Sequence, residues 1–242
     1  NRMADKLQEL VEGQSQMFQA VAHELRTPIA RIRFGLEMMA TASTEEEQLR
    51  REKQIIEDLD ELEKLISEIL VLVRFETAGT QLSRTPFDPA ETVEEQIYRF
   101  KPLHPEKSLL FEQESSLIIT VSLNEGSFAR VVHNLLSNAA RHARSQVIVR
   151  IRGDAHELLL EVEDDGPGIP VEERERVRRP FYRLDRSRSR DSGGVGLGLA
   201  IVDRIVKAHG GDISIVDASQ GGTIVQTRWP TAPQEELAKG SR

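Results

Sequence analysis

Two heptad seams of apolar residues, separated by one short polar stretch, fill the first 76 residues of this 242-residue chain. Steps of three and four residues between the apolar positions indicate helices of the coiled-coil type. The first seam contains Leu7, Val11, Phe18, Val21 or Ala22, Leu25, Ile29, Ile32, Leu36 and Met39, with Gln14 in its one polar position. The second seam contains Ile55, Leu59, Leu62, Ile66, Ile69 and Val73. The polar stretch at 41–47 predicts a turn and then a helix N-cap with an acidic first turn, so the two helices should form an antiparallel hairpin.

A single hairpin of this kind would leave much of its apolar stripe exposed. Two copies that form a four-helix bundle would bury the stripe, so we predict a homodimer through residues 5–76. The alternative is that the second half of the same chain covers the stripe. The regular heptads favour the dimer, because packing against a globular surface does not require strict periodicity.

The rest of the chain has a different pattern and predicts an α/β sandwich, with helices on one face of a mixed sheet. Candidate strands lie at 109–111, 117–122, 146–152, 157–163, 212–216 and 223–229. Candidate helices lie at 89–100, 125–143, 170–177 and 197–208. Alternating apolar residues at 147–151 and 158–162 predict a β-hairpin that turns at Gly153 and Asp154.

Composition excludes several kinds of function. The formal net charge of −8 argues against nucleic acid as a direct partner. The chain has no cysteine, which excludes disulfides, thiolate nucleophiles and cysteine-based zinc sites, and its six histidines lack the HExxH spacing. No apolar run approaches the roughly 20 residues that cross a bilayer, and no signal peptide is visible. The chain begins in helical phase without a start signal, so we expect a soluble piece of a longer protein.

One imidazole in the first helix could carry chemistry. The segment HELRTP places His23 beside Glu24 and Pro28 five residues after the histidine. The heptad position of His23 turns its side chain away from the seam into solvent. Pro28 cannot donate a hydrogen bond to the carbonyl of residue 24, so it should weaken or bend the helix there. A surface histidine is usually unremarkable, and the significance of this one depends on the second half of the chain.

Two glycine-rich loops in that half indicate a nucleotide site. In the loop DDGPGIP, Gly166 and Gly168 allow a close turn, and Asp164 offers an acceptor that an adenine amino group would satisfy. By itself this loop would be read as an ordinary Asp-Gly turn. The loop at 191–199 runs directly into a helix, and its dense glycines expose backbone N–H groups at the positive helix end: Gly194, Gly196 and Gly198. This loop is neither a Walker A motif nor a dinucleotide fingerprint.

The predicted helix 125–143 adds polar side chains. Asn134 and Asn138 lie four residues apart on one face, and a carboxamide oxygen suits Mg²⁺ that is bound together with phosphates. Arg141, one turn later, could contact a phosphate through two hydrogen bonds. Between the two glycine loops we expect a mobile basic lid anchored by Phe181 and Tyr182. Its polar residues are Arg178, Arg179, Arg183, Arg186, Ser187, Arg188, Ser189, Arg190 and Ser192.

The segments HELRTP, NLLSNA, DDGPGI, PFYR and GGVGLGLAIV, in this order, resemble the H, N, G1, F and G2 boxes of HisKA-type sensor histidine kinases. The resemblance covers nearly the whole chain. It implies that a HAMP-like linker helix ends at 1–12, followed by a dimerisation and phosphotransfer domain at 13–77 and a linker at 78–82. A catalytic ATP-binding domain of the histidine kinase/Hsp90/gyrase type would follow at 83–231, with a tail at 232–242. The missing part would be transmembrane helices and a sensor, which places this piece on the cytoplasmic side of a bacterial inner membrane.

The resemblance also implies residue roles. His23 would accept the γ-phosphate of ATP, with Glu24 orienting or deprotonating its ring. The phosphate would pass to an aspartate in the receiver domain of a response regulator, and Glu24 with Thr27 would place the water that dephosphorylates this partner. Asn138 matches the Mg²⁺ ligand. The remaining nucleotide-binding positions are Asn134, Arg141, Asp164, Gly166, Gly168, Phe181, Gly194, Gly196, Leu197 and Gly198.

The chain departs from the family pattern at two positions, and two other functions compete with the kinase. Arg178 replaces the first phenylalanine of the F box, and His142 replaces a frequent tyrosine. One alternative is an ATPase of the gyrase and Hsp90 superfamily. It is disfavoured because Asn134 stands where those relatives carry the glutamate that activates water. The other is a non-catalytic module for dimerisation and nucleotide sensing. Whether ATP serves His23 of the same or the opposite subunit depends on the handedness of the loop at 41–46, which sequence does not give.

Overall fold

The structure, a computed structural model, describes residues 2–42, 44–76, 83–113, 120–154, 156–184 and 194–231. It divides into two compact units, Asn1–Val73 and Arg74–Arg242. The linker predicted at 78–82 and the tail predicted at 232–242 lie outside the described residues, as do residues 185–193 of the predicted basic lid. Within the described part of the chain, no helix combines the length and the apolar character needed to span a membrane.

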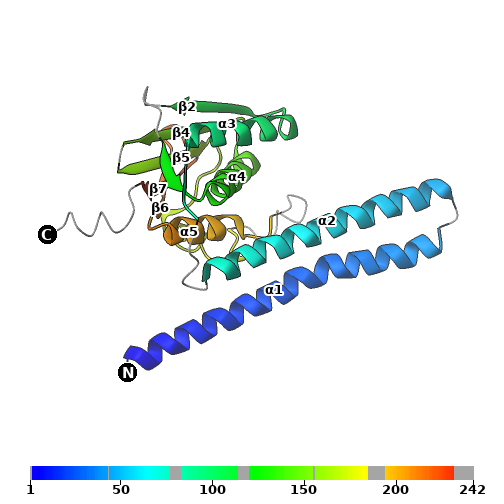
Figure 1. Cartoon of the computed structure of the whole chain (residues 1–242). Coiled ribbons are helices and arrows are strands. Elements are labelled where there is room, and N and C mark those ends of the chain that lie inside the picture. Colours follow the sequence, from blue (N-terminus) through cyan, green and yellow to red (C-terminus); the bar gives the residue numbers. More distant parts are fainter. Residues whose placement is uncertain are drawn as a thin grey trace. The chain divides into compact units, whose positions relative to one another are not determined.

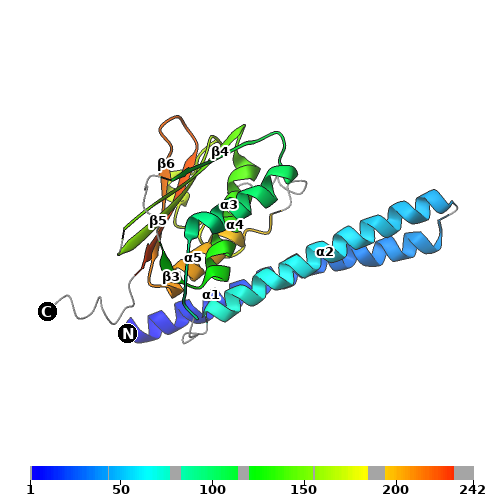
Figure 2. The same ribbon diagram turned by 45° about the horizontal axis from the view of Figure 1, so that its top comes forward.

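The first unit is a helical hairpin of α1 (Arg2–Ala40) and α2 (Glu45–Glu76), which run antiparallel and side by side (Figures 1 and 2). The side chain of Thr44 accepts a hydrogen bond from the backbone N–H of Glu47 at 3.2 Å. This bond caps α2 at its N-terminus, and three glutamates in the first turn complement the positive end of the helix. The predicted hairpin and its cap are therefore confirmed.

A close seam joins the two helices. Ile55, Leu65 and Leu72 of α2 are buried. A side chain at Gly35 of α1 would place its Cβ 2.9 Å from Cγ1 of Ile55, so the helices approach closely at this point. Beside this contact, Arg31 pairs with the buried carboxylate of Asp58 at 3.0 Å.

Only part of the predicted seam is buried within the single chain, as expected for a hairpin whose stripe needs a second partner. Positions that we expected in the seam are largely exposed: Phe18, Ile29, Leu36, Leu59, Ile66 and Val73. The buried row on α2 instead includes positions one residue earlier, Asp58, Leu65 and Leu72. On α2, one row is thus buried within the chain, while the adjacent apolar row of Leu59, Ile66 and Val73 is exposed.

The second unit is built on a five-stranded mixed sheet with the order β2-β4-β5-β7-β6. The β2 and β4 strands are parallel and the other neighbours are antiparallel. A separate antiparallel pair joins β1 to β3. The strands are β1 (Thr85–Phe87), β2 (Ser108–Gln113), β3 (Val121–Leu123), β4 (Gln146–Gly153), β5 (Glu157–Asp164), β6 (Asp212–Asp217) and β7 (Thr223–Pro230). The sandwich and the hairpin β4–β5 are as predicted. The short β1 was missed, and residues 117–119 of one predicted strand lie outside the described residues.

Three α-helices cover one face of this sheet (Figures 1 and 2). They are α3 (Pro89–Phe100), α4 (Glu125–His142) and α5 (Gly198–Ala208), and two short 3₁₀ turns, η1 (Lys101–Leu103) and η2 (Val171–Glu173), complete the unit. The apolar positions that alternate along β4 are buried beneath them: Val147, Val149 and Ile151. The alternation that predicted a half-buried strand thus sets which face of the sheet meets the helices.

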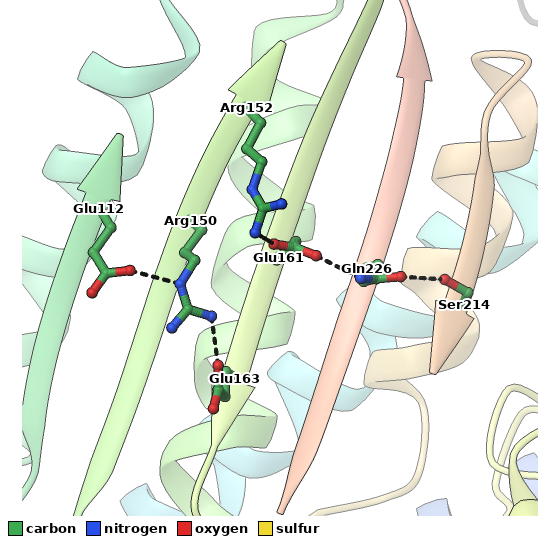
Figure 3. A network of polar contacts seen from close by, with 7 residues as sticks. All are labelled: Glu112, Arg150, Arg152, Glu161, Glu163, Ser214 and Gln226. Carbon is green, nitrogen blue, oxygen red and sulfur yellow. Dashed lines mark hydrogen bonds and ion pairs between the residues drawn. The ribbon is translucent and has the colours of Figure 1, made fainter. Parts of the chain in front are cut away.

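The opposite face of the sheet carries a polar network (Figure 3). Arg150 donates to Glu112 at 2.6 Å and also to Glu163, so one guanidinium joins three strands. A second series of hydrogen bonds crosses the neighbouring strands and links Arg152, Glu161, Gln226 and Ser214. These side chains alternate with the buried ones and leave this face polar.

The helix predicted at 170–177 is wrong. Only Val171–Glu173 is helical, as a 3₁₀ turn, and the following residues form successive turns. Pro170 is the N-cap of this turn, and its carbonyl accepts from the N–H of Glu173 at 2.9 Å, the three-residue spacing of a 3₁₀ turn. Arg174 holds these turns in place, because it donates to the carbonyl of Ile169 at 3.2 Å and pairs with Asp217.

Candidate functional site

His23 lies on α1 with 74% of its side chain exposed, and its Nδ1 is 3.1 Å from Oε1 of Glu24. A carboxylate can only accept, so in this pair the neutral ring carries its proton on Nδ1 and its lone pair on Nε2. Thr27, one turn further along α1, is also exposed, whereas Pro28 is buried. The outward orientation and the histidine–glutamate pairing are thus both present in the helical unit.

In the second unit, α4 and α5 together form the centre of the candidate nucleotide site. Asn134 on α4 donates to the carbonyl of Arg130 at 2.9 Å. Its Oδ1 would lie 3.4 Å from a Cβ at Gly198, the first residue of α5. Asn138, one turn further along α4, is half-buried. Leu197 at the N-cap of α5 is buried, and no described side chain caps this helix, so its first amide groups can serve an anion.

At two positions of the second glycine loop, other atoms lie too close to the backbone for any side chain, so only glycine fits. A Cβ at Gly194 would lie 2.1 Å from Nη1 of Arg141, so the guanidinium lies directly against this backbone. Gly196 has a φ of 79°, and a Cβ there would lie 2.8 Å from the carbonyl oxygen of Tyr182. The carbonyl of Gly196 accepts from the N–H of Phe181 at 2.9 Å, and Phe181 itself has a φ of 62°. The PFYR segment is therefore held to the start of α5 by the backbone, at the cost of a strained non-glycine residue.

Asp164 ends β5 with only 4% of its surface exposed. Its Oδ1 accepts from the N–H of Gly166 at 2.9 Å. Burial raises the pKa of Asp164, although backbone hydrogen bonds from Gly166 and Thr223 oppose the rise. A buried carboxylate has lone pairs to spare after these bonds, and a donor such as an adenine amino group would satisfy them.

The next residue, Asp165, has a positioning role that the sequence did not reveal. It accepts hydrogen bonds from the backbone N–H groups of Arg144, Ser145 and Gln146 at 2.7–3.1 Å, and from the Ser145 hydroxyl at 2.7 Å. Desolvation alone would raise the pKa of Asp165, but these hydrogen bonds together lower it far below its ordinary value. Asp165 thereby joins the first glycine loop to the turn that follows α4. A Cβ at Gly166 would lie 2.6 Å from the carbonyl oxygen of His142, so the loop also packs on the end of α4.

Gly222, in the turn between β6 and β7, was also missed. Its φ is 105°, and a Cβ there would lie 1.9 Å from the carbonyl oxygen of Asp164. Its own carbonyl oxygen would lie 3.4 Å from a Cβ at Gly168, whose φ is 84°. The signal in the sequence was the pair Gly221-Gly222, which resembles any turn.

Replacing Gly222 by alanine should lower the free energy of unfolding of the second unit by about 2–4 kcal/mol, since it adds a backbone clash to a strained φ. Gly221→Ala is the matched control, because Gly221 has a φ of 88° but nothing within 4 Å of its Cβ position. That variant should lose only about 1 kcal/mol. Denaturant unfolding followed by fluorescence of Trp229, the single tryptophan, measures both values. Equal losses of unfolding free energy in the two variants would contradict the predicted clash at Gly222.

Two family models match the chain. Residues 13–78 match the model described as "His Kinase A (phospho-acceptor) domain", and residues 124–233 match "Histidine kinase-, DNA gyrase B-, and HSP90-like ATPase". The chain belongs to the HisKA-type sensor histidine kinases. The first model covers the hairpin with His23, and the second covers the segment that contains α4, both glycine loops and α5.

Known sensor proteins resemble this chain over more than nine tenths of its residues. It is 36% identical to the sensor protein RstB of Escherichia coli K12 over 95% of the chain and 52% of RstB. It is 29% identical to the sensor histidine kinase CpxA of the same strain over 92% of the chain and 48% of CpxA. The chain thus spans about half the length of these relatives. The structure of histidine kinase ThkA in complex with response regulator protein TrrA has the same fold, with a TM-score of 0.75 and 23% identity over 94% of this chain and 65% of ThkA.

Proposed function

We propose that this chain is an ATP-dependent protein-histidine kinase that phosphorylates itself on His23 and passes the phosphoryl group to an aspartate of a response regulator. The observation that carries the proposal is the exposed pair of His23 and Glu24 in a chain that also contains the ATPase fold. The solved complex of ThkA with response regulator protein TrrA supports a response regulator as partner by analogy.

In the proposed reaction, Nε2 of His23 uses its lone pair to form a bond with the γ-phosphorus of ATP. The bond from that phosphorus to the bridging oxygen breaks, and its electron pair leaves with ADP. Glu24 holds the proton on Nδ1 and balances the positive charge that the ring gains. Glu24 together with Thr27 would place a water molecule that hydrolyses the phosphate on the partner and releases inorganic phosphate.

The nucleotide would bind between α4 and α5. Asp164 would accept from the adenine amino group, while Arg141 and the first amide groups of α5 would contact phosphates. Mg²⁺, when bound, neutralises phosphate charge, and the carboxamide oxygen of Asn138 suits it as a ligand. Among the described residues, no group of three or more histidine, aspartate or glutamate side chains could hold a metal.

We further propose that the second apolar row of the hairpin is buried in a homodimer through residues 5–76. The largely exposed positions Phe18, Ile29, Leu36, Leu59, Ile66 and Val73 support this, because a water-facing stripe of this size is unusual for a monomer. Equilibrium sedimentation should give twice the chain mass, and a monomer at all concentrations would contradict it. The domain boundaries at residues 12, 77, 82 and 231, and attachment to the cytoplasmic side of a membrane, stay predictions from the family.

The proposal is tested by incubating the chain with ATP labelled on the γ-phosphate. We expect label on the protein that acid removes and alkali leaves, as for a phosphorus–nitrogen bond. Release of labelled phosphate without labelled protein would indicate the ATPase alternative. If neither labelled protein nor labelled phosphate forms, the result would indicate the nucleotide-sensing module. An acid-stable label on the protein would indicate a hydroxyl acceptor. Each of these outcomes overturns the proposal.

A further inference from the structure

Arg178 and Asp203 form an ion pair between the segment that follows η2 and the helix α5. Nε and Nη2 of Arg178 donate to Oδ1 of Asp203 at 2.9 and 2.6 Å. The two side chains are only 15% and 11% exposed. Lys207 donates to the other oxygen of Asp203 at 2.9 Å, and Glu175 accepts from Nη1 of Arg178 at 2.9 Å. The pair is therefore the buried centre of a network of charged hydrogen bonds whose outer members, Glu175 and Lys207, are exposed.

The pair joins the two segments that form the phosphate end of the site. Asp203 lies on α5, one and a half turns after Gly198, where the amide groups for an anion begin. Arg178 lies three residues before Phe181, whose N–H is bonded to Gly196. The same segment is also held by the hydroxyl of Tyr182, which donates to Glu173. The ion pair therefore adds a side-chain attachment to α5 beside the backbone hydrogen bond from Phe181 to Gly196.

We infer that Arg178 and Asp203 are positioning residues that hold the segment 174–182 on α5, so that the glycines before α5 are arranged for nucleotide phosphates before ATP binds. The ion pair does this at the position where the family carries a phenylalanine. The inference rests on nucleotide binding under the proposed function. It predicts an effect on affinity rather than on the chemical step, because both side chains act on the shape of the nucleotide site and neither belongs to the unit that carries His23.

The test is a double-mutant cycle on ATP affinity, with Arg178→Leu, Asp203→Leu and the double variant. Each single variant leaves one buried charge without its main partner and should weaken Mg-ATP binding roughly tenfold. The double variant replaces the ion pair by apolar side chains and should regain most of the affinity. At saturating ATP, the autophosphorylation rate should change by no more than about twofold in all three. Calorimetric titration gives the affinity, and labelled ATP gives the rate.

Arg150→Leu is the matched control. Arg150 is 18% exposed and pairs with two carboxylates on the far face of the sheet (Figure 3), so it should lower stability without changing ATP affinity. Unchanged affinity in both single variants would overturn the inference, as would a double variant no better than the singles. A wild-type chain that binds no nucleotide would instead overturn the proposed function, so the two failures are distinct.

Discussion

The His23→Gln variant should acquire no label from ATP labelled on the γ-phosphate, while its affinity for Mg-ATP stays within about twofold of the unsubstituted chain. Glutamine is polar and favourable in a helix, but its carboxamide has no nucleophilic nitrogen. The His23 side chain is exposed and pairs with the neighbouring Glu24 on the helix surface, so its loss should not unfold the hairpin. The measurement is protein-bound label after a fixed time, normalised to folded protein.

His104→Gln is the matched control for this loss. Nδ1 of His104 lies 3.7 Å from a carboxylate oxygen of Glu106, so it too is a histidine beside a glutamate, but in the second unit. It should keep full labelling. Residual label on His23→Gln, or loss of label on His104→Gln, would show that a different side chain accepts the phosphate.

The second large effect concerns Asp164. Asp164→Asn should weaken ATP binding by about 10- to 150-fold, the value of a hydrogen bond to a charged acceptor. Asparagine has the shape to keep the bond from Gly166, yet it offers fewer lone pairs to an adenine amino group. Labelling at low ATP concentration should fall by the same factor.

Although Asp164→Asn should weaken ATP binding, it should raise the free energy of unfolding at neutral pH. Burial raises the pKa of Asp164 above its ordinary 3.8 in the folded state, so the folded protein binds that proton more tightly than the unfolded chain does. The stability that Asp164 contributes is therefore fully present below pH 3.8 and is lost as pH rises through the raised value. At neutral pH, Asp164→Asn should unfold at a higher denaturant concentration than the unsubstituted chain, and the difference should vanish in acid.

Asp154→Asn is the control, because the pKa of Asp154 is shifted in the opposite direction from that of Asp164. Backbone hydrogen bonds from His156 and then Glu157 lower the pKa of Asp154, which lies at the other end of the β4–β5 hairpin. This variant should bind ATP normally and should be no more stable than the unsubstituted chain at neutral pH. Equal ATP affinity in Asp154→Asn and Asp164→Asn would contradict the adenine role of Asp164.

The periodic elements could be predicted from the sequence because each depends on local spacing. Apolar steps of three and four predicted α1 and α2, and alternation predicted β4 and β5. Local spacing does not show which of two adjacent apolar rows meets the same chain. Leu59 and Ile66 have the seam spacing, yet they are exposed while Asp58 and Leu65 are buried. The partner of a row is a tertiary property, so spacing could not show which row is buried within the chain.

The same limit of local spacing explains which residues of the candidate site could be predicted from the sequence. Asn134, Asp164 and the glycines before α5 stand in motifs, and their residue types alone suggested a nucleotide. Asp165, Gly222 and Asp203 act through neighbours that are 19 to 58 residues distant in the chain, such as Gln146 for Asp165 and Asp164 for Gly222. Neither spacing nor composition reports such contacts. The sequence predicts Arg178 as part of a mobile basic lid, whereas the structure buries it against Asp203.

The central claim is that ATP bound by the second unit phosphorylates the imidazole of His23. The most direct measurement is identification of the phosphorylated residue in the chain after incubation with Mg-ATP, by tandem mass spectrometry of peptides prepared at alkaline pH. We predict one phosphoryl group per modified chain, on the peptide that contains His23 and on its imidazole. A phosphoryl group on any other residue, or ATP consumed with no modified peptide, would contradict the account.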